Sequence, residues 1–341
     1  LSIMKKSILL INKSGLNEPF KNALEQEGFI VKSFFGEPFL PFRRNLVQKF
    51  TNILRRFLFN DKNYLLQKEQ QFYDLQLVRR SKSITNDAKF DYALFFRGDL
   101  FPAELIASIR QVSSMMISYQ YDGMEVSKKI LNYSSFFDRI FVFDPSDYKM
   151  FKTRGFLPLT NCWFSDPDLS QINKLDFFYI GVGIDDRKMK IHQLQNHIKN
   201  SYSLKAILTI PFFRIEEKHD GIEYAHQGLS YSENMNFVKS SNVLIDFKLP
   251  YHEGLSFRFF EAMYYNKKMI TNNASVLHYD FYDPNNIYIT DFDDFSGLDA
   301  FMNLPYRTGN PQIIQKYGFS NWIKNVLNIE PHEKINLPEC K

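Results

Sequence analysis

The chain has 341 residues, 44% of them hydrophobic and 23% charged, with a formal net charge of +4. These values are typical of a globular protein, and the length allows two domains that each have a hydrophobic core. The two cysteines, Cys162 and Cys340, exclude a disulfide framework and a cysteine-rich metal site, and they favour a reducing compartment.

The first residues predict a buried strand rather than a targeting segment. The apolar run Ser7–Ile11 is too short for the core of a signal peptide, and Lys13 interrupts it. No run approaches the ~18 apolar residues of a transmembrane helix. Residues 1–165 carry 24 Lys and Arg against 16 Asp and Glu, hence +8, and the remainder carries 18 against 22, hence −4. The basic first half therefore favours an anionic partner.

The first half alternates short apolar strands with helical segments. This alternation is typical of an open, mostly parallel sheet flanked by helices, in which ligands lie beyond the carboxyl ends of the strands. Polar residues follow three of these strands, at 97–99, 120–123 and 144–147, and they are the first places to look for a site. The strands expected in this half are Ser7–Asn12, Phe29–Phe35, Tyr92–Phe96, Met115–Tyr119 and Arg139–Phe143, with helices at Glu18–Gln26 and after Pro102.

A long insertion at 37–88 interrupts the alternation. Within it, residues 43–59 predict an amphipathic helix with strong positive charge. Such a helix can lie on an anionic membrane surface, or it can pack on the domain core with a solvated basic face. The apolar face contains Leu46, Val47, Phe50, Ile53, Leu54 and Phe57, and the basic residues are Arg43, Arg44, Lys49, Arg55 and Arg56.

The polar stretch 165–174 predicts a domain boundary. The alternation then restarts, and residues 311–327 predict terminal helices that carry Trp322. The expected elements of this half are strands at Phe177–Val182, Leu204–Ile210, Val243–Phe247, Met269–Thr271 and Ile287–Ile289, and a helix at Arg187–Lys199.

Two glutamates in the second half stand seven residues apart. Glu253 lies in the loop after strand Val243–Phe247, and Glu261 lies about two turns into the predicted helix Leu255–Tyr265. The spacing alone is weak evidence, and a capping Glu with a solvated helix Glu would give the same pattern. The setting, a strand–loop–helix–strand unit, makes the pair a candidate site.

The start of this helix suits a diphosphate. Free backbone N–H groups and the helix dipole favour an anion there. Gly254 allows close approach of a ligand, and Arg258 can add a charge-assisted hydrogen bond. A carboxylate can accept two hydrogen bonds from a sugar diol.

With these residues the chain resembles the retaining glycosyltransferases of the GT-B fold, whose signature is a Glu-x7-Glu pair in this setting. The resemblance implies an α/β architecture of two Rossmann-like, doubly wound domains that face a cleft, followed by C-terminal helices. It implies an acceptor domain at 1–165, a donor domain at 166–320 and a helix and tail at 321–341. It also implies that Glu253 contacts the donor sugar, the amides of Gly254, Leu255 and Ser256 contact the diphosphate, and Glu261 contacts the ribose.

Three further residues are candidates. The resemblance implies that a basic residue after the strand ending in Gly181-Val182-Gly183 contacts the diphosphate. Arg187 is the best-placed candidate and Lys190 is the second. The alternative is that Arg187 is only an exposed residue after a glycine turn. Asp122 can orient an acceptor hydroxyl or take its proton. Arg97 can neutralise an anionic acceptor group, and strand-end residues of both kinds also serve as structural caps.

Other motifs are rejected. Asp291-Phe292-Asp293 spells a metal-binding D-x-D, but Asp293 or Asp294 is expected to cap a helix instead. GT-B enzymes generally need no bound metal, so the resemblance implies no metal and no cofactor beyond the nucleoside-diphosphate sugar that serves as donor. The basic residues do not form a nucleic-acid-binding module.

The resulting hypothesis is a cytoplasmic glycosyltransferase that acts with retention on a glycan or lipid-linked acceptor, at the inner face of the cell membrane if the basic helix binds lipid. Bacterial lipopolysaccharide, capsule or exopolysaccharide synthesis is the setting that the resemblance implies. Two alternatives stay open: a sugar-nucleotide epimerase of GT-B shape, and a non-catalytic glycan-binding or scaffold protein.

Overall fold

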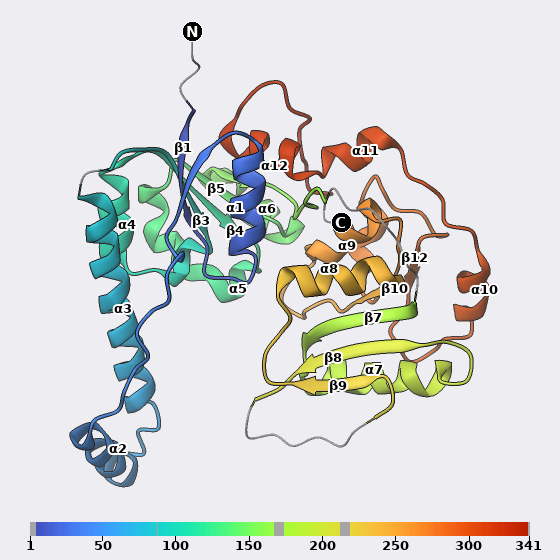
Figure 1. Ribbon diagram of the computed structural model, residues 1–341, viewed down its shortest axis with the longest axis horizontal. Coiled ribbons are helices and arrows are strands. Elements are labelled where there is room, and N and C mark those ends of the chain that lie inside the picture. The colour runs from blue at the N-terminus through green and yellow to red at the C-terminus, as the bar shows by residue number, and fades with distance from the viewer. Residues whose placement is uncertain (1–4, 87, 167–173, 212–218, 340–341) are drawn as a thin grey trace. The chain divides into compact units, whose positions relative to one another are not determined.

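The computed structural model describes residues 5–86, 88–166, 174–211 and 219–339. It contains two six-stranded sheets with flanking helices, one formed by the first half of the chain and one by the second (Figure 1). The predicted alternation of strands and helices is thus confirmed.

The first sheet has the order β2-β1-β3-β4-β5-β6. Strands β1 and β3 lie inside the sheet and are largely apolar on both faces, and β1 pairs in parallel with both β2 and β3. The strands are β1 (Ser7–Ile11), β2 (Ile30–Ser33), β3 (Phe90–Phe96), β4 (Ser113–Gln120), β5 (Arg139–Val142) and β6 (Phe156–Pro158). The helices are α1 (Asn17–Gln26), α2 (Leu46–Phe59), α3 (Tyr64–Thr85), α4 (Ala103–Arg110), α5 (Met124–Ser127) and α6 (Pro145–Phe151).

The second sheet has the order β12-β11-β10-β7-β8-β9, and β7 and β10 at its centre pair in parallel. One face carries a core that includes Phe177, Ile191 and Val243. The strands are β7 (Leu175–Val182), β8 (Leu204–Thr209), β9 (Ile222–Ala225), β10 (Ser241–Asp246), β11 (Lys268–Thr271) and β12 (Ile287–Ile289). The helices are α7 (Asp185–Ile198), α8 (Tyr231–Ser240), α9 (Phe257–Tyr264), α10 (Leu298–Asn303), α11 (Pro311–Lys316) and α12 (Phe319–Leu327).

The chain divides into two compact units. The first contains residues 1–120 and 126–140, and the second contains residues 121–125 and 141–341. The sheets themselves divide between Pro158 and Leu175. The predicted boundary at 165/166 lies in that interval, of which residues 167–173 are outside the described part, so the boundary stays a prediction.

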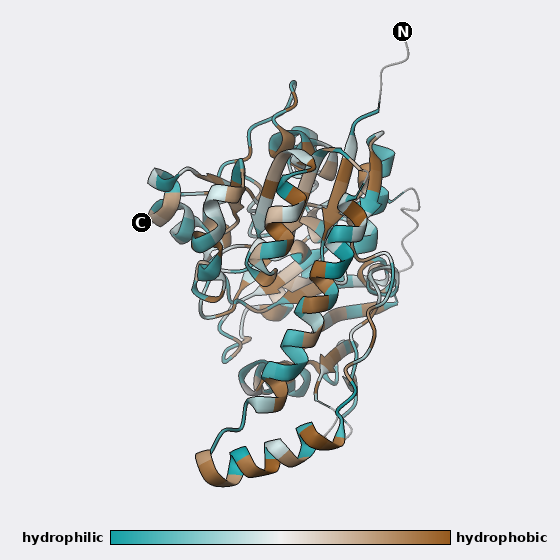
Figure 2. Cartoon of the chain, turned by 90° about the vertical axis from the view of Figure 1, so that its left-hand side faces the viewer, coloured by the Kyte–Doolittle hydropathy of each residue, from teal (hydrophilic) through white to brown (hydrophobic). Residues whose placement is uncertain are grey.

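Helix α2 lies at the far end of α3, away from the sheet of its own unit (Figures 1 and 2). Asn45 and Gln48 form a capping box that fixes its start. None of its residues is buried. Packing of this helix on the domain core, one of the two interpretations that the sequence allowed, is therefore wrong.

The terminal helices are confirmed, and Trp322 is buried in α12, where its indole N–H donates to the carbonyl of Thr160 at 2.8 Å. The predicted cap near residue 294 is wrong in detail. Asp294 accepts from the amide of Ser296 at 2.9 Å in a turn, whereas Gly297 is the N-cap of α10. None of the described helices has the length and apolar composition to cross a membrane.

Candidate functional site

A cavity of ≈ 210 Å³ lies in the second unit, where β10 and β11 end and α7 and α9 begin. Ligands of parallel α/β sheets bind at this edge. The cavity brings together five of the predicted site residues, Asp122, Arg187, Gly254, Ser256 and Arg258. The other lining residues are Tyr121, Phe143, Asn161, Asp246, Phe247, Lys248, Leu249, His252, Phe257 and Asn273.

Asp246, the last residue of β10, organises the start of α9. Its carboxylate is buried and accepts a hydrogen bond from Ser256 Oγ at 2.6 Å and from Arg258 Nη1 at 3.2 Å. Arg258 also donates to the carbonyl of Ile180, and its guanidinium lies 5.4 Å from the centre of the Tyr179 ring. These contacts hold Arg258 in one orientation at the cavity wall.

A second guanidinium lines the same cavity. Arg187, in the first turn of α7, donates from Nη2 to the carbonyl of Phe247 at 3.3 Å. Its Nε is buried and has no hydrogen-bond partner among the described residues. Burial raises the pKa of the nearby Tyr179 phenol, and the charges of Arg258 and Arg187 oppose that shift. Because both arginines line the cavity, it can supply positively charged hydrogen-bond donors to an anion.

The loop that carries Glu253 is anchored to Asp144, the N-cap of α6. The buried Asp144 carboxylate accepts from the amide of Asp147 at 3.0 Å, from that of Gly254 at 2.9 Å and from that of Glu253. Glycine is required at 254, because an added Cβ would lie 2.4 Å from the Phe143 ring. The Gly254 amide, predicted to bind a diphosphate, thus donates to a protein carboxylate here.

The backbone of Glu253 is fixed whereas its side chain is accessible. Its carbonyl accepts from Ser275 Oγ at 2.6 Å and from Asn273 Nδ2 at 3.2 Å. The side chain is 45% exposed, with the Lys248 ammonium 3.6 Å from one carboxylate oxygen. Ser146 Oγ lies 3.4 Å from the other oxygen. Glu253 itself does not line the ≈ 210 Å³ cavity, although its neighbours His252 and Gly254 do, so its contact with a donor sugar stays a prediction.

His252 and Asp122 add groups that can transfer protons. Burial lowers the pKa of His252, although the charges of Asp144, Asp122 and Asp246 oppose that shift. The imidazole is therefore neutral at pH 7. Its Nδ1 is buried without a hydrogen-bond partner in the described part of the chain. A neutral imidazole next to a carboxylate can act as a general base.

Glu261 does not line this cavity. It is 3% exposed on α9. Burial raises its pKa to about 7, whereas the charge of Arg258 and a hydrogen bond from Tyr231 oppose the rise. Leu255 is also buried, and its carbonyl accepts from Asn161 Nδ2 at 2.9 Å. The predicted contacts of Glu261 with ribose and of the Leu255 amide with a diphosphate stay predictions.

The pKa of Glu261 predicts a pH dependence of stability. Because the pKa in the folded state, about 7, lies above the ordinary value of 4.5, the folded state binds this proton more tightly. The contribution of this proton to the free energy of unfolding is fully present below pH 4.5. It is lost as the pH rises to 7 and above, and the total loss is about 3 kcal/mol. Glu261→Gln removes this loss, so we expect the variant to gain stability relative to wild type between pH 5 and pH 8.

Urea unfolding of both proteins at each pH measures this difference. Subtracting the wild-type free energy of unfolding from that of the variant at each pH cancels the contributions of the other titrating groups. One of these is Asp147, whose pKa burial raises to about 6. Parallel curves would show that Glu261 remains ionised in the folded protein throughout this range.

Arg97 belongs to the first unit and is committed to local contacts. Its Nε and Nη2 donate to the two oxygens of Asp99, each at 2.8 Å, and Nη2 also donates to the carbonyl of Val126 at 3.2 Å. An anionic acceptor group would have to replace Asp99, so the acceptor role of Arg97 stays a prediction. Lys190 pairs with Asp186 at 3.1 Å and does not line the ≈ 210 Å³ cavity.

The sequence interpretation missed several residues of the site. Asp144 stood at a predicted strand end but received no role, and His252 was not among the candidates. Asp246 ends a recognised strand, which was the signal for it. Asn161 and Asn273 gave no signal, because their roles depend on contacts with segments far away in the sequence.

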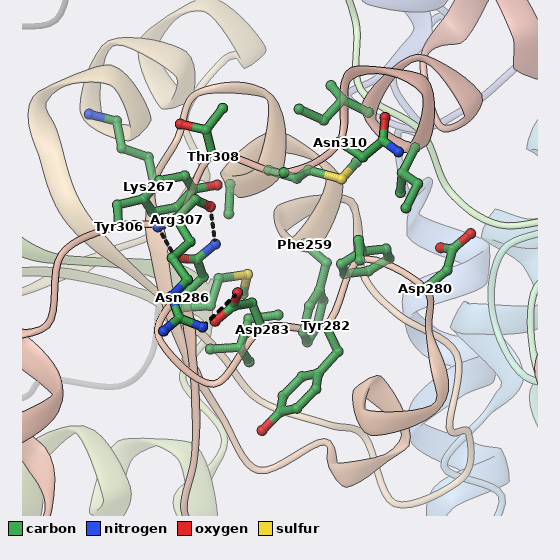
Figure 3. A pocket seen from close by; sticks show the side chains of 18 residues that line it. Phe259, Lys267, Asp280, Tyr282, Asp283, Asn286, Tyr306, Arg307, Thr308 and Asn310 are labelled. Carbon is green, nitrogen blue, oxygen red and sulfur yellow. Dashed lines mark hydrogen bonds and ion pairs between the residues drawn. The ribbon is translucent and has the colours of Figure 1, made fainter.

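A second cavity of ≈ 250 Å³ lies in the same unit, beneath α9 and the segment 306–314 (Figure 3). Its polar groups bind one another: Arg307 lies 3.8 Å from Asp283, and the Asn286 side chain exchanges hydrogen bonds with the backbone of Arg307. None of the predicted site residues lines it. Within the described ranges, no group of three His, Cys, Asp or Glu could hold a metal ion.

No protein-family model matches the chain, and no curated protein matches it. Solved structures do match it. S. aureus MnaA in complex with UDP has 13% identity and a TM-score of 0.55, over 98% of this chain and 100% of that one. An α,α-trehalose-phosphate synthase (UDP-forming) from Burkholderia vietnamiensis has 10% identity and a TM-score of 0.53, over 95% and 99%.

A UDP-N-acetylglucosamine 2-epimerase has 10% identity and a TM-score of 0.51, over 97% of this chain and 98% of that one. At such identities the similarity establishes the fold and not the activity. Together with the two parallel sheets, it confirms the fold that the sequence predicts: the chain has the two-domain α/β architecture of the GT-B type.

Proposed function

We propose that the chain is a glycosyltransferase that uses a nucleoside-diphosphate sugar. The observation that carries this proposal is the pair of guanidiniums, Arg187 and Arg258, that line one cavity of a GT-B fold. Arg187 lines the cavity, and its Nε has no partner within the described part of the chain, so we propose that this guanidinium binds a phosphate oxygen. The similar structures support a nucleotide ligand, since one is a complex with UDP and another is named as UDP-forming.

In this mechanism the protein stabilises the charge that develops on the departing diphosphate. Arg187 and Arg258 supply charged donors whose positions are fixed before the reaction, which is electrostatic catalysis. Glu253 contacts the donor sugar through its accessible carboxylate. Asp122 orients the acceptor hydroxyl or accepts its proton. Retention of configuration, the absence of a metal requirement and the ribose contact of Glu261 complete the proposal.

The acceptor that we propose is a glycan or a lipid-linked saccharide, and the reaction belongs to bacterial surface-polysaccharide synthesis on the cytoplasmic side of the cell membrane. The net charge of +8 over residues 1–165 favours an anionic acceptor for the first unit. No nucleic acid is involved.

Nucleotide release from UDP-, GDP-, ADP-, dTDP- and CMP-linked sugars tests the proposal. We expect one donor to turn over and Glu253→Gln to reduce that turnover about 100-fold, in line with the loss of one transition-state contact. Stability should remain nearly unchanged, because the side chain is half-exposed and the backbone makes the anchoring contacts.

Glu223→Gln is the matched control, since Glu223 is also half-exposed and pairs with a lysine, Lys205, at 2.5 Å. Equal turnover by both variants would remove Glu253 from the mechanism. The absence of turnover, together with no thermal shift from any nucleotide, would favour the non-catalytic glycan-binding or scaffold protein.

The second candidate function is a sugar-nucleotide epimerase of GT-B shape. The neutral, half-buried imidazole of His252 near Asp122 favours it, because epimerisation requires a base and no acceptor. Incubation of the active donor in D₂O without acceptor separates the two reactions. Deuterium on the recovered sugar, lost in His252→Asn, would identify an epimerase, whereas recovery of unlabelled donor would favour the transferase.

A further inference from the structure

Helix α2 presents an apolar face that no described residue covers. Leu46, Phe50 and Phe57 lie on one face of the helix and are 81%, 64% and 86% exposed. Figure 2 shows hydrophobic residues, coloured brown, along much of this helix. Contiguous exposed apolar surface of this kind marks an interaction site. The same face also exposes Val47, Ile53, Leu54 and Leu58.

The segment around this face carries positive charge only. Residues 38–60 contain five Arg and Lys and no Asp or Glu. Arg55 pairs with Asp61 at 3.3 Å. The other four, Arg43, Arg44, Lys49 and Arg56, have no ion pair within the described ranges. The partner of this surface must therefore be apolar and negatively charged at the same time.

We infer that α2 docks on the surface of an anionic lipid bilayer, with its axis parallel to the membrane. The apolar face enters the boundary between headgroups and acyl chains, and the arginines and lysines contact lipid phosphates. The helix has 14 residues, too few to span a bilayer. A second copy of the chain is a poorer occupant, because two α2 helices would bring cations together without anions to offset them.

The position of α2 suits this role. It lies at the end of α3, away from the sheet of its unit, so the apolar face is accessible without unfolding any other element (Figure 1). The capping box of Asn45 and Gln48 keeps the helix formed before it meets lipid. Docking by α2 does not depend on the reaction proposed for the second unit.

Co-sedimentation of the full chain with vesicles tests this inference. We expect binding to vesicles in which roughly a third of the lipid is phosphatidylglycerol, and weak binding to pure phosphatidylcholine. Phe50→Ser with Phe57→Ser should weaken binding at least ~100-fold, because the variant lacks two phenyl groups whose transfer from water into the bilayer favours binding. Leu75→Ser is the control, since Leu75 is 58% exposed on α3, outside this face.

Arg43→Gln with Arg44→Gln tests the electrostatic part. Each cation near an anionic surface contributes about a five-fold factor, so the pair should weaken binding roughly 25-fold on anionic vesicles only. Lys128→Gln with Lys129→Gln is the matched control, because it removes two adjacent exposed cations elsewhere in the first unit.

Equal binding to both vesicle types, or wild-type binding by the double phenylalanine variant, would overturn the inference. Lipid-free dimerisation that the same variant abolishes would assign the face to a second copy of the chain and would also overturn it. Thermal unfolding should not change in any variant, since none of the altered side chains is buried. Turnover of soluble donor should also persist, which separates loss of docking from failure of the proposed reaction.

Discussion

Asp144→Ala is expected to lower the free energy of unfolding by about 3–5 kcal/mol, the largest stability effect that we predict. The carboxylate is 2% exposed and accepts from three backbone amides, those of Asp147, Glu253 and Gly254. Its removal leaves these donors without their acceptor in a buried position, and it also removes the N-cap of α6. Urea denaturation at constant pH measures the change.

Asp144→Asn should restore only part of the stability. The asparagine side chain has one oxygen, which cannot accept both from the amide of Asp147 and from the amides of Glu253 and Gly254. Its NH₂ group would therefore face either the first amide or the other two. Asp293→Ala is the control, because Asp293 is exposed and should change stability by no more than about 0.5 kcal/mol. If Asp144→Ala lowers the free energy of unfolding no more than the control does, water has replaced the carboxylate as the acceptor of these hydrogen bonds.

Arg187→Gln is expected to reduce kcat/KM for the active donor by about 10²–10³-fold, the largest effect on activity. Among the described residues the guanidinium donates at 3.3 Å to the carbonyl of Phe247 and interacts with the Tyr179 hydroxyl, so its removal should cost little stability. Glutamine keeps a donor amide but carries no charge, so the contribution to a developing phosphate charge disappears. Initial rates of nucleotide release, with unfolding midpoints measured in parallel, give both quantities.

Calorimetry on the free ligands shows which part of the donor Arg187 contacts. Affinity for the nucleoside diphosphate should fall in Arg187→Gln, and affinity for the nucleoside should not. Arg307→Gln is the control, because this arginine belongs to the same unit and lines the separate ≈ 250 Å³ cavity. An equal loss for nucleoside and nucleoside diphosphate would place Arg187 away from the phosphates.

Most of the fold could be predicted from the sequence, because buried strands and amphipathic helices leave local signatures. Strand β10 was expected at Val243–Phe247 and is observed at Ser241–Asp246. Two short strands were missed: β6 ends in Pro158, and β9 contains the charged Glu223, so neither forms an apolar run. Helix α8 begins with a capping box at Ser230 that went unnoticed.

The site was predictable where its residues adjoin one recognised element. Gly254, Ser256 and Arg258 surround the start of α9 and line one cavity with Arg187. Asp122, which was expected in the acceptor domain at 1–165, belongs to the second unit and lines the same cavity. Asp144 was not predictable as the anchor of the Glu253 loop, since 109 residues separate the two.

The sequence alone determined the order of most strands along the chain and the amphipathic character of α2, because these follow from local periodicity and composition, and the resemblance implied the GT-B architecture. Tertiary structure decided the solvent exposure and the pKa of each charged group. Glu253 and Glu261 are the same residue type in one motif, yet one is half-exposed and the other is buried with a raised pKa. Exposure, and with it pKa and availability to a ligand, depends on which distant segments pack around a side chain, which local sequence does not specify.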